Sequence, residues 1–339
     1  MKVGKLNSDD LKKLIDDNRS VQRKDVRIRS GIGEDCSIIN FGDYDCVVST
    51  DPITGSHNNI GKLAVHINCN DIASCGVEPI GLLVTILAPE KTTLDDLNTI
   101  MKDIDSEAKK LNVEILGGHT EITTAVNKII ISCTAIGKSK AGKAVPTKGA
   151  NLGDDIVVTK ELAMEGTSII INDYYDMVKS FLTEGEIEEG RSFIDGVSVV
   201  PEGIVAGEFG VNSMHDITEG GVLGALWEVA EAGKVGFIVQ KDKMPINRIT
   251  MKICGKYNID PLRFISSGSM LITTKDGEGL VKKLRNSGIK STIIGNITKK
   301  NGIIEDSGVK VKVSPPERDE LFIFIDKIKW QLKEGILWE

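Results

Sequence analysis

Hydrophobic residues in the first half of the chain recur with two different spacings, which predict alternating strands and helices. Short apolar runs are typical of strands, and they occur at Cys46–Thr50, Ile80–Leu87 and Lys128–Ile136. Apolar spacings of three and four residues predict helices over Ile60–Cys75 and Leu94–Leu111. This order of elements predicts a fold of the α+β class with α/β-type layers.

The second half shows the same alternation after a polar, glycine-containing stretch, Gly137–Gly153, which predicts a domain boundary. Strands are predicted at Asp155–Thr159, Val235–Val239, Met270–Thr273, Ser291–Ile294 and Val309–Val313. Helices are predicted at Glu161–Ile171, Val197–Phe209, Leu223–Ala232, Asp276–Ser287 and Glu317–Leu332. We therefore expect two domains followed by a terminal helix.

Two aspartates interrupt the apolar pattern of the first half. Asp51 ends the strand Cys46–Thr50, and Asp71 lies on the apolar stripe of the helix Ile60–Cys75. A buried carboxylate costs on the order of several kcal/mol unless a cation or hydrogen-bond donors compensate its charge. The pair therefore indicates a metal ion or a metal-bound phosphate. In the alternative interpretation, Asp51 is a turn residue before Pro52 and Asp71 bonds the neighbouring backbone.

Two glycine-containing stretches are candidate phosphate loops. In Gly31–Ser37 (GIGEDCS) the backbone amides either face phosphate oxygens or close a tight hairpin turn. Gly117, Gly118, His119 and Thr120 follow a predicted strand and are interpreted as a turn. Such a turn presents amides and a hydroxyl to an anion, and the histidine is either a ligand, a proton carrier or a hydrogen-bonded turn residue.

The stretch Asp216–Gly221 precedes a predicted helix and has two interpretations. Asp216 as the N-cap and Glu219 three residues later would form a capping box. The two glycines that follow weaken a helix start, so close packing against a ligand or a facing helix is the alternative. Lys62 and Lys148 are either phosphate partners or solvated surface lysines.

Composition narrows the classes of function and location. The 339 residues carry a net charge of −7 without a basic tract, so nucleic acid is not an expected partner. The start MKVGKLNSDDLKK is too polar for a signal peptide, and the apolar run Pro79–Pro89 is too short to span a bilayer. The six cysteines show no CxxC pair, which predicts free thiols. We expect a cytoplasmic protein without membrane partners.

An ordered set of motifs, covering the chain up to Val313, resembles the PurM or AIR synthase superfamily of ATP-using proteins. The motifs are GIGEDC, STD, NDIASCGVEP, GGHTE, GDDIVVTK, DITEGG and IDPLRFISSGSMLI. Within the superfamily, MHDITEGGVLGALWEVAEAGKVG and IDPLRFISSGSMLI most resemble the HypE proteins, which mature nickel–iron hydrogenases.

The resemblance implies a PurM-like two-domain fold. Residues 1–147 would form an ATP- and magnesium-binding domain with flanking helices, whose β-barrel is shared by the two subunits of a homodimer. Residues 148–314 would form an α/β sandwich, and 315–339 a C-terminal helix. ATP would lie near the interface between the subunits.

The same resemblance implies site residues, position by position. Asp35, Asp51 and Asp71 match acids that hold magnesium and ATP phosphates, and the last two are the expected catalytic residues. The expected nucleotide-binding positions are Gly33, Asp35, Lys62, Gly117, Gly118, His119, Thr120 and Asp216.

Two departures from the family pattern bear on function. His119 stands where relatives have an acid, and imidazole is a poor magnesium ligand, so Glu121 is a candidate replacement. HypE proteins end in a cysteine that accepts a carbamoyl group, whereas this chain has no cysteine after Cys254 and ends KEGILWE. The HypE cysteine reaction is therefore not expected.

We expect an ATP- and magnesium-dependent protein that phosphorylates an oxygen nucleophile in hydrogenase maturation or a related activation. The alternatives are a nucleotide-binding maturation or scaffold protein without catalysis, and a small-molecule kinase of the thiamine-monophosphate type. The acceptor is either a small molecule or a protein, and hydrogenase-maturation proteins are candidate partners.

Overall fold

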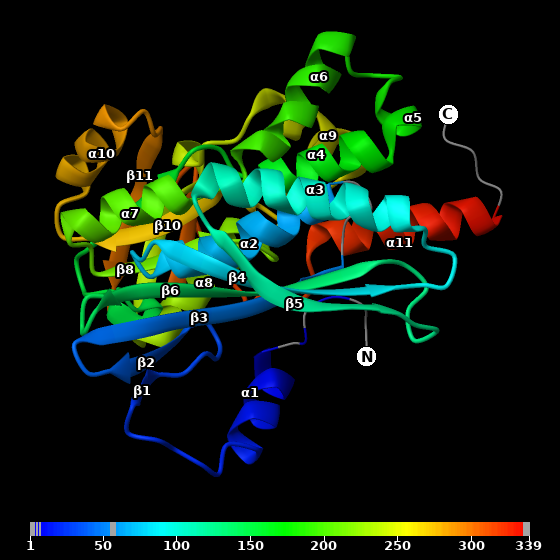
Figure 1. The fold of residues 1–339 in the computed structure, drawn as a ribbon. Coiled ribbons are helices and arrows are strands. Elements are labelled where there is room, and N and C mark those ends of the chain that lie inside the picture. The colour runs from blue at the N-terminus through cyan, green and yellow to red at the C-terminus, as the bar shows by residue number, and fades with distance from the viewer. Residues whose placement is uncertain (1–3, 5, 7, 55–58, 335–339) are drawn as a thin grey trace.

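Two β-sheets form the centre of the molecule in the computed structural model, which describes residues 4, 6, 8–54 and 59–334 (Figure 1). The first sheet has six strands in the order β1-β2-β3-β6-β4-β5, antiparallel except for the β4–β5 pair. Its strands are β1 (Val26–Ile28), β2 (Ser37–Phe41), β3 (Tyr44–Ile53), β4 (Pro79–Ala88), β5 (Glu114–Ile122) and β6 (Ile130–Lys140).

Helices α2 (Ile60–Ser74) and α3 (Leu94–Leu111) cover one face of this sheet, while α1 (Ser8–Asp17) lies apart from them (Figure 1). Residues of β3 and β6 are alternately buried and more exposed along much of their length, as expected of a sheet that is packed on one face. The predicted helix Leu94–Leu111 is confirmed. A capping box starts it, because Thr93 Oγ1 accepts from the Asp96 amide and Asp96 Oδ2 accepts from the Thr93 amide.

The second sheet has seven strands in the order β13-β12-β9-β11-β7-β10-β8, antiparallel except for β9–β12. Its strands are β7 (Asp155–Thr159), β8 (Ser213–Ile217), β9 (Gly236–Gln240), β10 (Ser269–Thr274), β11 (Ser291–Thr298), β12 (Gly302–Asp306) and β13 (Val309–Lys312). All five residues of the edge strand β8 are buried, and helix α2 of the first domain packs against it.

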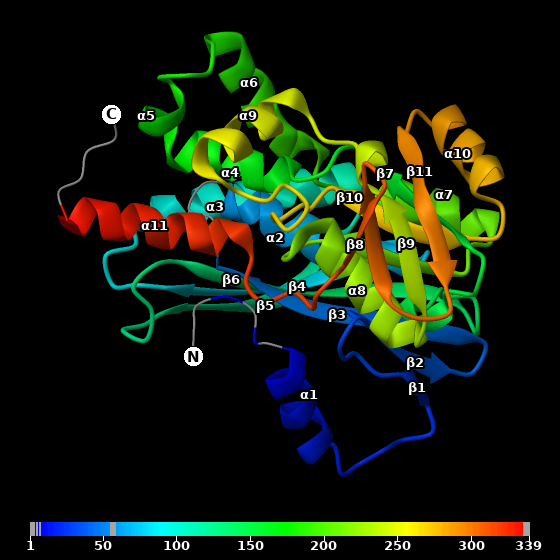
Figure 2. The same ribbon diagram turned by 180° about the vertical axis from the view of Figure 1, so that it is seen from behind.

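Helices cover both faces of the second sheet (Figure 2). Those that pack on it are α7 (Val200–Phe209), α8 (Gly221–Gly233) and α10 (Gly277–Asn286). The remaining helices form a separate cluster: α4 (Met164–Asp173), α5 (Tyr175–Val178), α6 (Glu184–Ser192), α9 (Arg248–Tyr257) and α11 (Glu320–Glu334). Short 3₁₀ turns occur at η1 (Thr147–Gly149), η2 (Phe193–Gly196) and η3 (Lys241–Lys243).

The terminal helix α11 packs on the body of the molecule. Its Phe324 ring meets the rings of Tyr174 and Tyr257 edge-on, with centroids 5.2 Å apart in both pairs. The two-domain PurM-like fold is confirmed by the comparisons reported below, whereas the shared barrel and the boundaries at 147 and 314 stay predictions.

The stretch around Gly117 and Gly118 is a strand, so its interpretation as a turn was wrong. Both glycines lie within β5, with φ of 145° and 154°. A Cβ on Gly118 would lie 1.7 Å from the carbonyl oxygen of Val84 on β4. Gly118 therefore allows the close parallel pairing of β5 with β4 rather than a change of chain direction.

The interpretation of Asp216 as a helix cap was also wrong. Asp216 lies inside β8, paired with Met270 of β10, and the N-cap of α8 is Gly220. Gly221 has φ of 61°, and a Cβ there would lie 2.6 Å from the carbonyl oxygen of Leu262. Gly221 is therefore closely packed, but against the turn that contains Leu262 rather than against a facing helix, and packing against a ligand stays a prediction.

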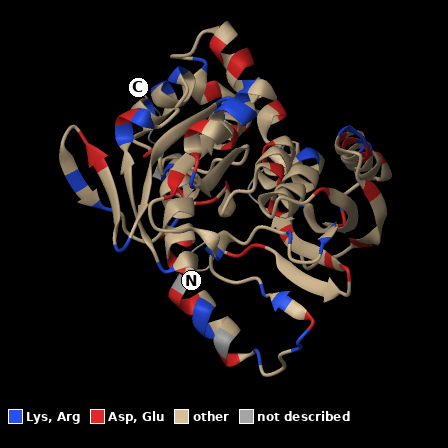
Figure 3. Cartoon of the chain, turned by 90° about the vertical axis from the view of Figure 1, so that its left-hand side faces the viewer, with Lys and Arg blue, Asp and Glu red and all other residues tan. Residues whose placement is uncertain are grey.

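Charge and cysteine placement agree with the expectations from composition. Lys and Arg are interspersed with Asp and Glu over the described elements (Figure 3). All six cysteines are free, and burial raises the pKa of Cys133 to about 12, which keeps that thiol protonated. Within the described residues, no helix has the length and apolar character needed to cross a membrane.

Candidate functional site

Four aspartates from separate segments meet where the two domains touch. Asp35 precedes β2, Asp51 lies on β3, Asp71 on α2 and Asp216 on β8. Burial, followed by the charges of Asp216, Asp51 and Asp35, holds the pKa of Asp71 well above its ordinary value. Burial and the charge of Asp35 raise the pKa of Asp216 to about 7. Mutual repulsion of this kind is relieved by a bound cation.

Polar side chains next to the acids fix their positions. The Ser49 hydroxyl lies 2.6 Å from Asp71 Oδ2 and 3.2 Å from the carbonyl oxygen of Asp35. Asn68 Oδ1 accepts from the Asp51 amide at 2.8 Å, and its Nδ2 donates to the Asp51 carbonyl at 3.3 Å. Three of the four acids are thus tied to one another through Ser49 and Asn68 on neighbouring elements.

Asn70, which precedes Asp71 on α2, joins this helix to the second domain. Its Nδ2 donates to the carbonyl oxygen of Val197, and its Oδ1 accepts from the amide of Val199, both at 2.8 Å. The side chain is fully buried. This two-way bond sets the position of Asp71 relative to Asp216.

The glycine-containing segment before Asp35 is a tight turn that packs on the second domain. Gly31 and Glu34 exchange backbone hydrogen bonds of 2.8 and 3.2 Å. Gly33 has φ of 73°, and a Cβ there would lie 2.7 Å from the carbonyl oxygen of Glu228 on α8. Of the two interpretations of this segment, the hairpin turn is confirmed, and the nucleotide-binding role of Gly33 stays a prediction.

Sequence reasoning missed a buried histidine beside the acids. His215 is 2% exposed, its Nδ1 lies 2.9 Å from Asp35 Oδ2, and its Nε2 lies 2.9 Å from Glu228 Oε2. Burial opposes a charge on this ring, but the carboxylates of Asp35 and Glu228 outweigh it and raise the pKa of His215. The available signal was the position of His215 directly before Asp216 in the motif MHDITEGG.

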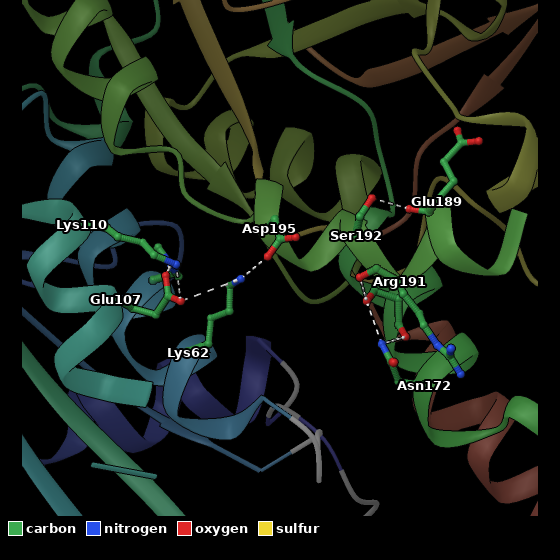
Figure 4. A network of polar contacts seen from close by, with 10 residues as sticks. Lys62, Glu107, Lys110, Asn172, Glu189, Arg191, Ser192 and Asp195 are labelled. Carbon is green, nitrogen blue, oxygen red and sulfur yellow. Dashed lines mark hydrogen bonds and ion pairs between the residues drawn. The ribbon is translucent and has the colours of Figure 1, made fainter. Parts of the chain in front are cut away.

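The remaining predicted residues lie away from the four acids. The Lys62 ammonium bonds Asp195 of the second domain and lies 3.9 Å from Glu107 Oε1 (Figure 4). Gly118 shares a cross-strand row with Asp51 but lies three strands away on the sheet edge.

His119 and Thr120 lie on the same edge strand as Gly118. The His119 ring is exposed, with Nε2 3.3 Å from Glu121 Oε2 on the same strand. The geometry of a single chain does not support nucleotide-binding roles for Lys62 and Gly117–Thr120. These roles stay predictions.

The four acids have the chemistry of a site for a hard divalent cation. Asp216 Oδ2 is buried and has no hydrogen-bond partner within the part of the chain that the structure describes. Buried polar atoms are almost always paired, so this one indicates a missing ligand. Carboxylate oxygens are the donors that Mg²⁺ prefers. Asp35 and Asp216 offer ligand atoms within 4.8 Å of one another, and the metal-binding roles of Asp51 and Asp71 stay predictions.

Family models match most of both domains. Residues 33–139 match the N-terminal domain of AIR synthase related proteins, and residues 151–307 match their C-terminal domain. The chain belongs to the AIR synthase related protein family.

Several relatives of this family member have assigned names. A Methanocaldococcus jannaschii protein named for hydrogenase expression and formation is 32% identical over 82% of this chain and 84% of its own. Carbamoyl dehydratase HypE of Bradyrhizobium diazoefficiens is 26% identical, covering 74% and 72%. Thiamine-monophosphate kinase of Pyrococcus horikoshii is 27% identical, covering 80% and 84%.

Solved structures show that this family member has the HypE and ThiL fold. HypE in its complex with HypF superposes with a TM-score of 0.75 at 21% identity, covering 90% of this chain and 99% of that one. A ThiL protein bound to AMPPCP and TMP gives 0.73 at 20%, covering 92% and 96%. HypE in complex with ATP gives 0.67 at 19%, covering 82% and 87%. At these identities the likeness supports the fold alone.

Proposed function

We propose that the protein binds ATP with a divalent cation at the four aspartates and transfers the terminal phosphoryl group to an oxygen nucleophile, as a HypE-like maturation factor. The observation that carries this proposal is the convergence of Asp35, Asp51, Asp71 and Asp216, where burial together with the charges of neighbouring aspartates raises the pKa values of Asp71 and Asp216. A bound Mg²⁺ would neutralise charge on the phosphates. The relative from Methanocaldococcus jannaschii, which is named for hydrogenase expression and formation, supports the maturation role.

The proposal gives a part to the four acids, to their polar neighbours and to the edge strand β5. Asp35, Asp51, Asp71 and Asp216 hold the cation, and Ser49 and Asn68 keep three of these acids in place. Residues Gly117–Thr120 of the exposed edge strand β5 would reach a nucleotide only from a second copy of the chain. We therefore include the homodimer, with the nucleotide near its interface, in the proposal.

A phosphoryl transfer to a small molecule is the second candidate, and one comparison favours it. The thiamine-monophosphate kinase of Pyrococcus horikoshii covers nearly as much of the chain as the hydrogenase-related relative. The nucleotide site would be the same in both cases, and only the acceptor would differ.

ATP consumption by the purified protein tests the proposal directly. We expect saturable, cation-dependent ATP binding and slow phosphate release, accelerated by the acceptor. Asp51→Asn should remove the binding, whereas Asp195→Asn, which changes an exposed acid outside the cluster, should not. Binding without phosphate release under any acceptor would favour the non-catalytic scaffold. Absence of saturable ATP binding would contradict both forms of the proposal.

A further inference from the structure

We propose that His215 is itself a ligand of the cation at the aspartates, so that this site takes a first-row transition cation such as Mn²⁺ or Co²⁺ in preference to Mg²⁺. The inference rests on the proposed function only in that the acids hold a cation. It goes beyond it in naming a nitrogen ligand and the class of metal.

The geometry of three side chains is that of neighbouring ligands on one ion. Asp35, His215 and Asp216 each offer a ligand atom, and these atoms all lie within 4.8 Å of one another. His215 Nδ1 and Asp35 Oδ2 are 2.9 Å apart. Adjacent donors on an octahedral cation with bonds of about 2.1 Å lie about 3 Å apart. A cation can therefore replace the proton between these two groups with little movement of either side chain.

The third side chain adds an independent sign of a missing partner. Asp216 is 2% exposed, and its Oδ2 has no hydrogen-bond partner in the described part of the chain. It belongs to the same three-residue group as His215 and Asp35. The buried acceptor Asp216 Oδ2 would be satisfied if Asp216, His215 and Asp35 all bound one ion.

The second ring nitrogen of His215, Nε2, is bonded as it is in metal-binding histidines. His215 Nε2 lies 2.9 Å from Glu228 Oε2, and this carboxylate is itself nearly buried. Ligating histidines almost always donate their other ring N–H to a carboxylate or carbonyl, which fixes the tautomer and the ring plane. Glu228 would thus hold the proton on Nε2 and leave Nδ1 to the cation.

The donor set determines the class of metal. Mg²⁺ strongly favours all-oxygen surroundings, whereas imidazole nitrogen suits the later first-row cations. A site of carboxylates with one imidazole gains affinity across Mn²⁺ and Co²⁺ relative to Mg²⁺. Carboxylates from Asp51 and Asp71 nearby keep the site hard enough for Mn²⁺.

Pulsed electron paramagnetic resonance on the whole protein with Mn²⁺ alone, without nucleotide, tests the ligand directly. We expect coupling of the bound Mn²⁺ to a directly bonded nitrogen, and we expect that coupling to change when the protein is labelled with ¹⁵N-histidine. The chain has four histidines, so single variants assign the nitrogen. His66→Gln is the matched control, because His66 is also buried and bonded to a glutamate.

The expected assignment is specific to one residue. His215→Gln should lose the nitrogen coupling and bind Mn²⁺ at least about tenfold more weakly, with a smaller loss for Mg²⁺. His57→Gln, His66→Gln and His119→Gln should keep the coupling, which identifies His215 by elimination even if its own variant fails to fold. Bound Mn²⁺ without histidine coupling, or no saturable Mn²⁺ binding, would overturn the inference. Cation-dependent ATP binding would in that case leave the proposed function standing.

Discussion

Two buried histidines in this molecule make the same bond, but their pKa values are shifted in opposite directions. His66 on α2 and His215 on β8 each place Nε2 2.9 Å from a glutamate Oε2, Glu107 on α3 and Glu228 on α8 respectively. Both rings are almost fully buried. Burial lowers the pKa of His66, whereas the pKa of His215 is raised despite burial.

The difference comes from the next layer of charges around each pair. Glu107 is shared with two lysines: Lys110 Nζ lies 2.8 Å from its Oε1 and Lys62 Nζ 3.9 Å (Figure 4). These cations oppose a charge on His66. His215 instead meets a second carboxylate, Asp35, at its other ring nitrogen. A histidine–glutamate bond is therefore not sufficient evidence of function. The charged residues that contact the pair decide whether it is structural or part of a site.

The largest expected effect on nucleotide binding is at the aspartates that adjoin the His215 pair. Asp71→Asn should abolish cation-dependent nucleotide binding, a loss of at least about 100-fold in affinity, which corresponds to roughly 3 kcal/mol. Glu107→Gln, which changes the glutamate of the His66 pair, should leave that affinity unchanged. Titration calorimetry with a non-hydrolysable ATP analogue measures both.

Stability provides the control for this variant. Burial and neighbouring acids raise the pKa of Asp71, so its charge is unfavourable in the folded state without a cation. Asp71→Asn should therefore be at least as stable as the wild type. An unchanged nucleotide affinity in a folded Asp71→Asn protein would remove Asp71 from the site.

Removal of each histidine should destabilise the protein to different extents. His215→Ala leaves the buried carboxylate of Glu228 and the partly buried one of Asp35 without their cation, and breaking a buried ion pair in this way costs about 3–5 kcal/mol. His66→Ala removes a neutral ring, and the remaining Glu107 still contacts Lys110, so we expect a loss of about 1–3 kcal/mol. Urea unfolding at pH 7 measures both, and equal losses would contradict the charge difference between the pairs.

Lys62→Met tests whether the lysines near Glu107 lower the pKa of His66. Its partner Asp195 is 70% exposed, so we expect a loss below about 1 kcal/mol in unfolding free energy. Because the charge of Lys62 opposes protonation of His66, the pKa of His66 should rise in this variant, as followed by NMR of the ring protons. ATP affinity should stay unchanged. A tenfold loss of ATP affinity would instead support the phosphate-binding role that the sequence predicted for Lys62.

The smallest effect is the pH dependence that His66 contributes to stability. Its pKa in the folded protein lies below that in the unfolded chain, so the unfolded chain takes up the proton first as the pH falls. The contribution of His66 is therefore fully present above the unfolded pKa and is lost as the pH falls towards the folded one. His66→Gln should show a flatter loss of unfolding free energy between pH 7 and pH 5, and an identical slope would contradict the lowered pKa.

Sequence patterns predicted the elements of the fold where periodicity and burial agree. The helix Leu94–Leu111 was predictable because its apolar stripe and exposed face alternate regularly. The strand β8 was not, because all of its residues are buried and it carries His215 and Asp216 among apolar neighbours. The strand β5 was mistaken for a turn because two adjacent glycines are typical of turns, whereas here the neighbouring strand β4 leaves no room for a side chain at Gly118.

The site was predictable in part for a similar reason. Asp51 and Asp71 stand out locally, since each places a carboxylate in an apolar segment. The bond between His215 and Glu228 was not predictable, because it depends on how β8 and α8 pack. The contact of His215 with Asp35 joins residues 180 positions apart and follows only from the meeting of the two domains.

The two-way bond of Asn70 constrains how any ligand reaches the acids. Asn68 holds α2 to Asp51 within the first domain, and Asn70 holds the same helix to Val197 and Val199 of the second. A swinging motion of one domain against the other would therefore break both buried hydrogen bonds of Asn70. Substrate access by a rigid-body opening of the two domains is therefore disfavoured. Ligand entry and exit should instead rely on local movements of side chains and loops around the acids.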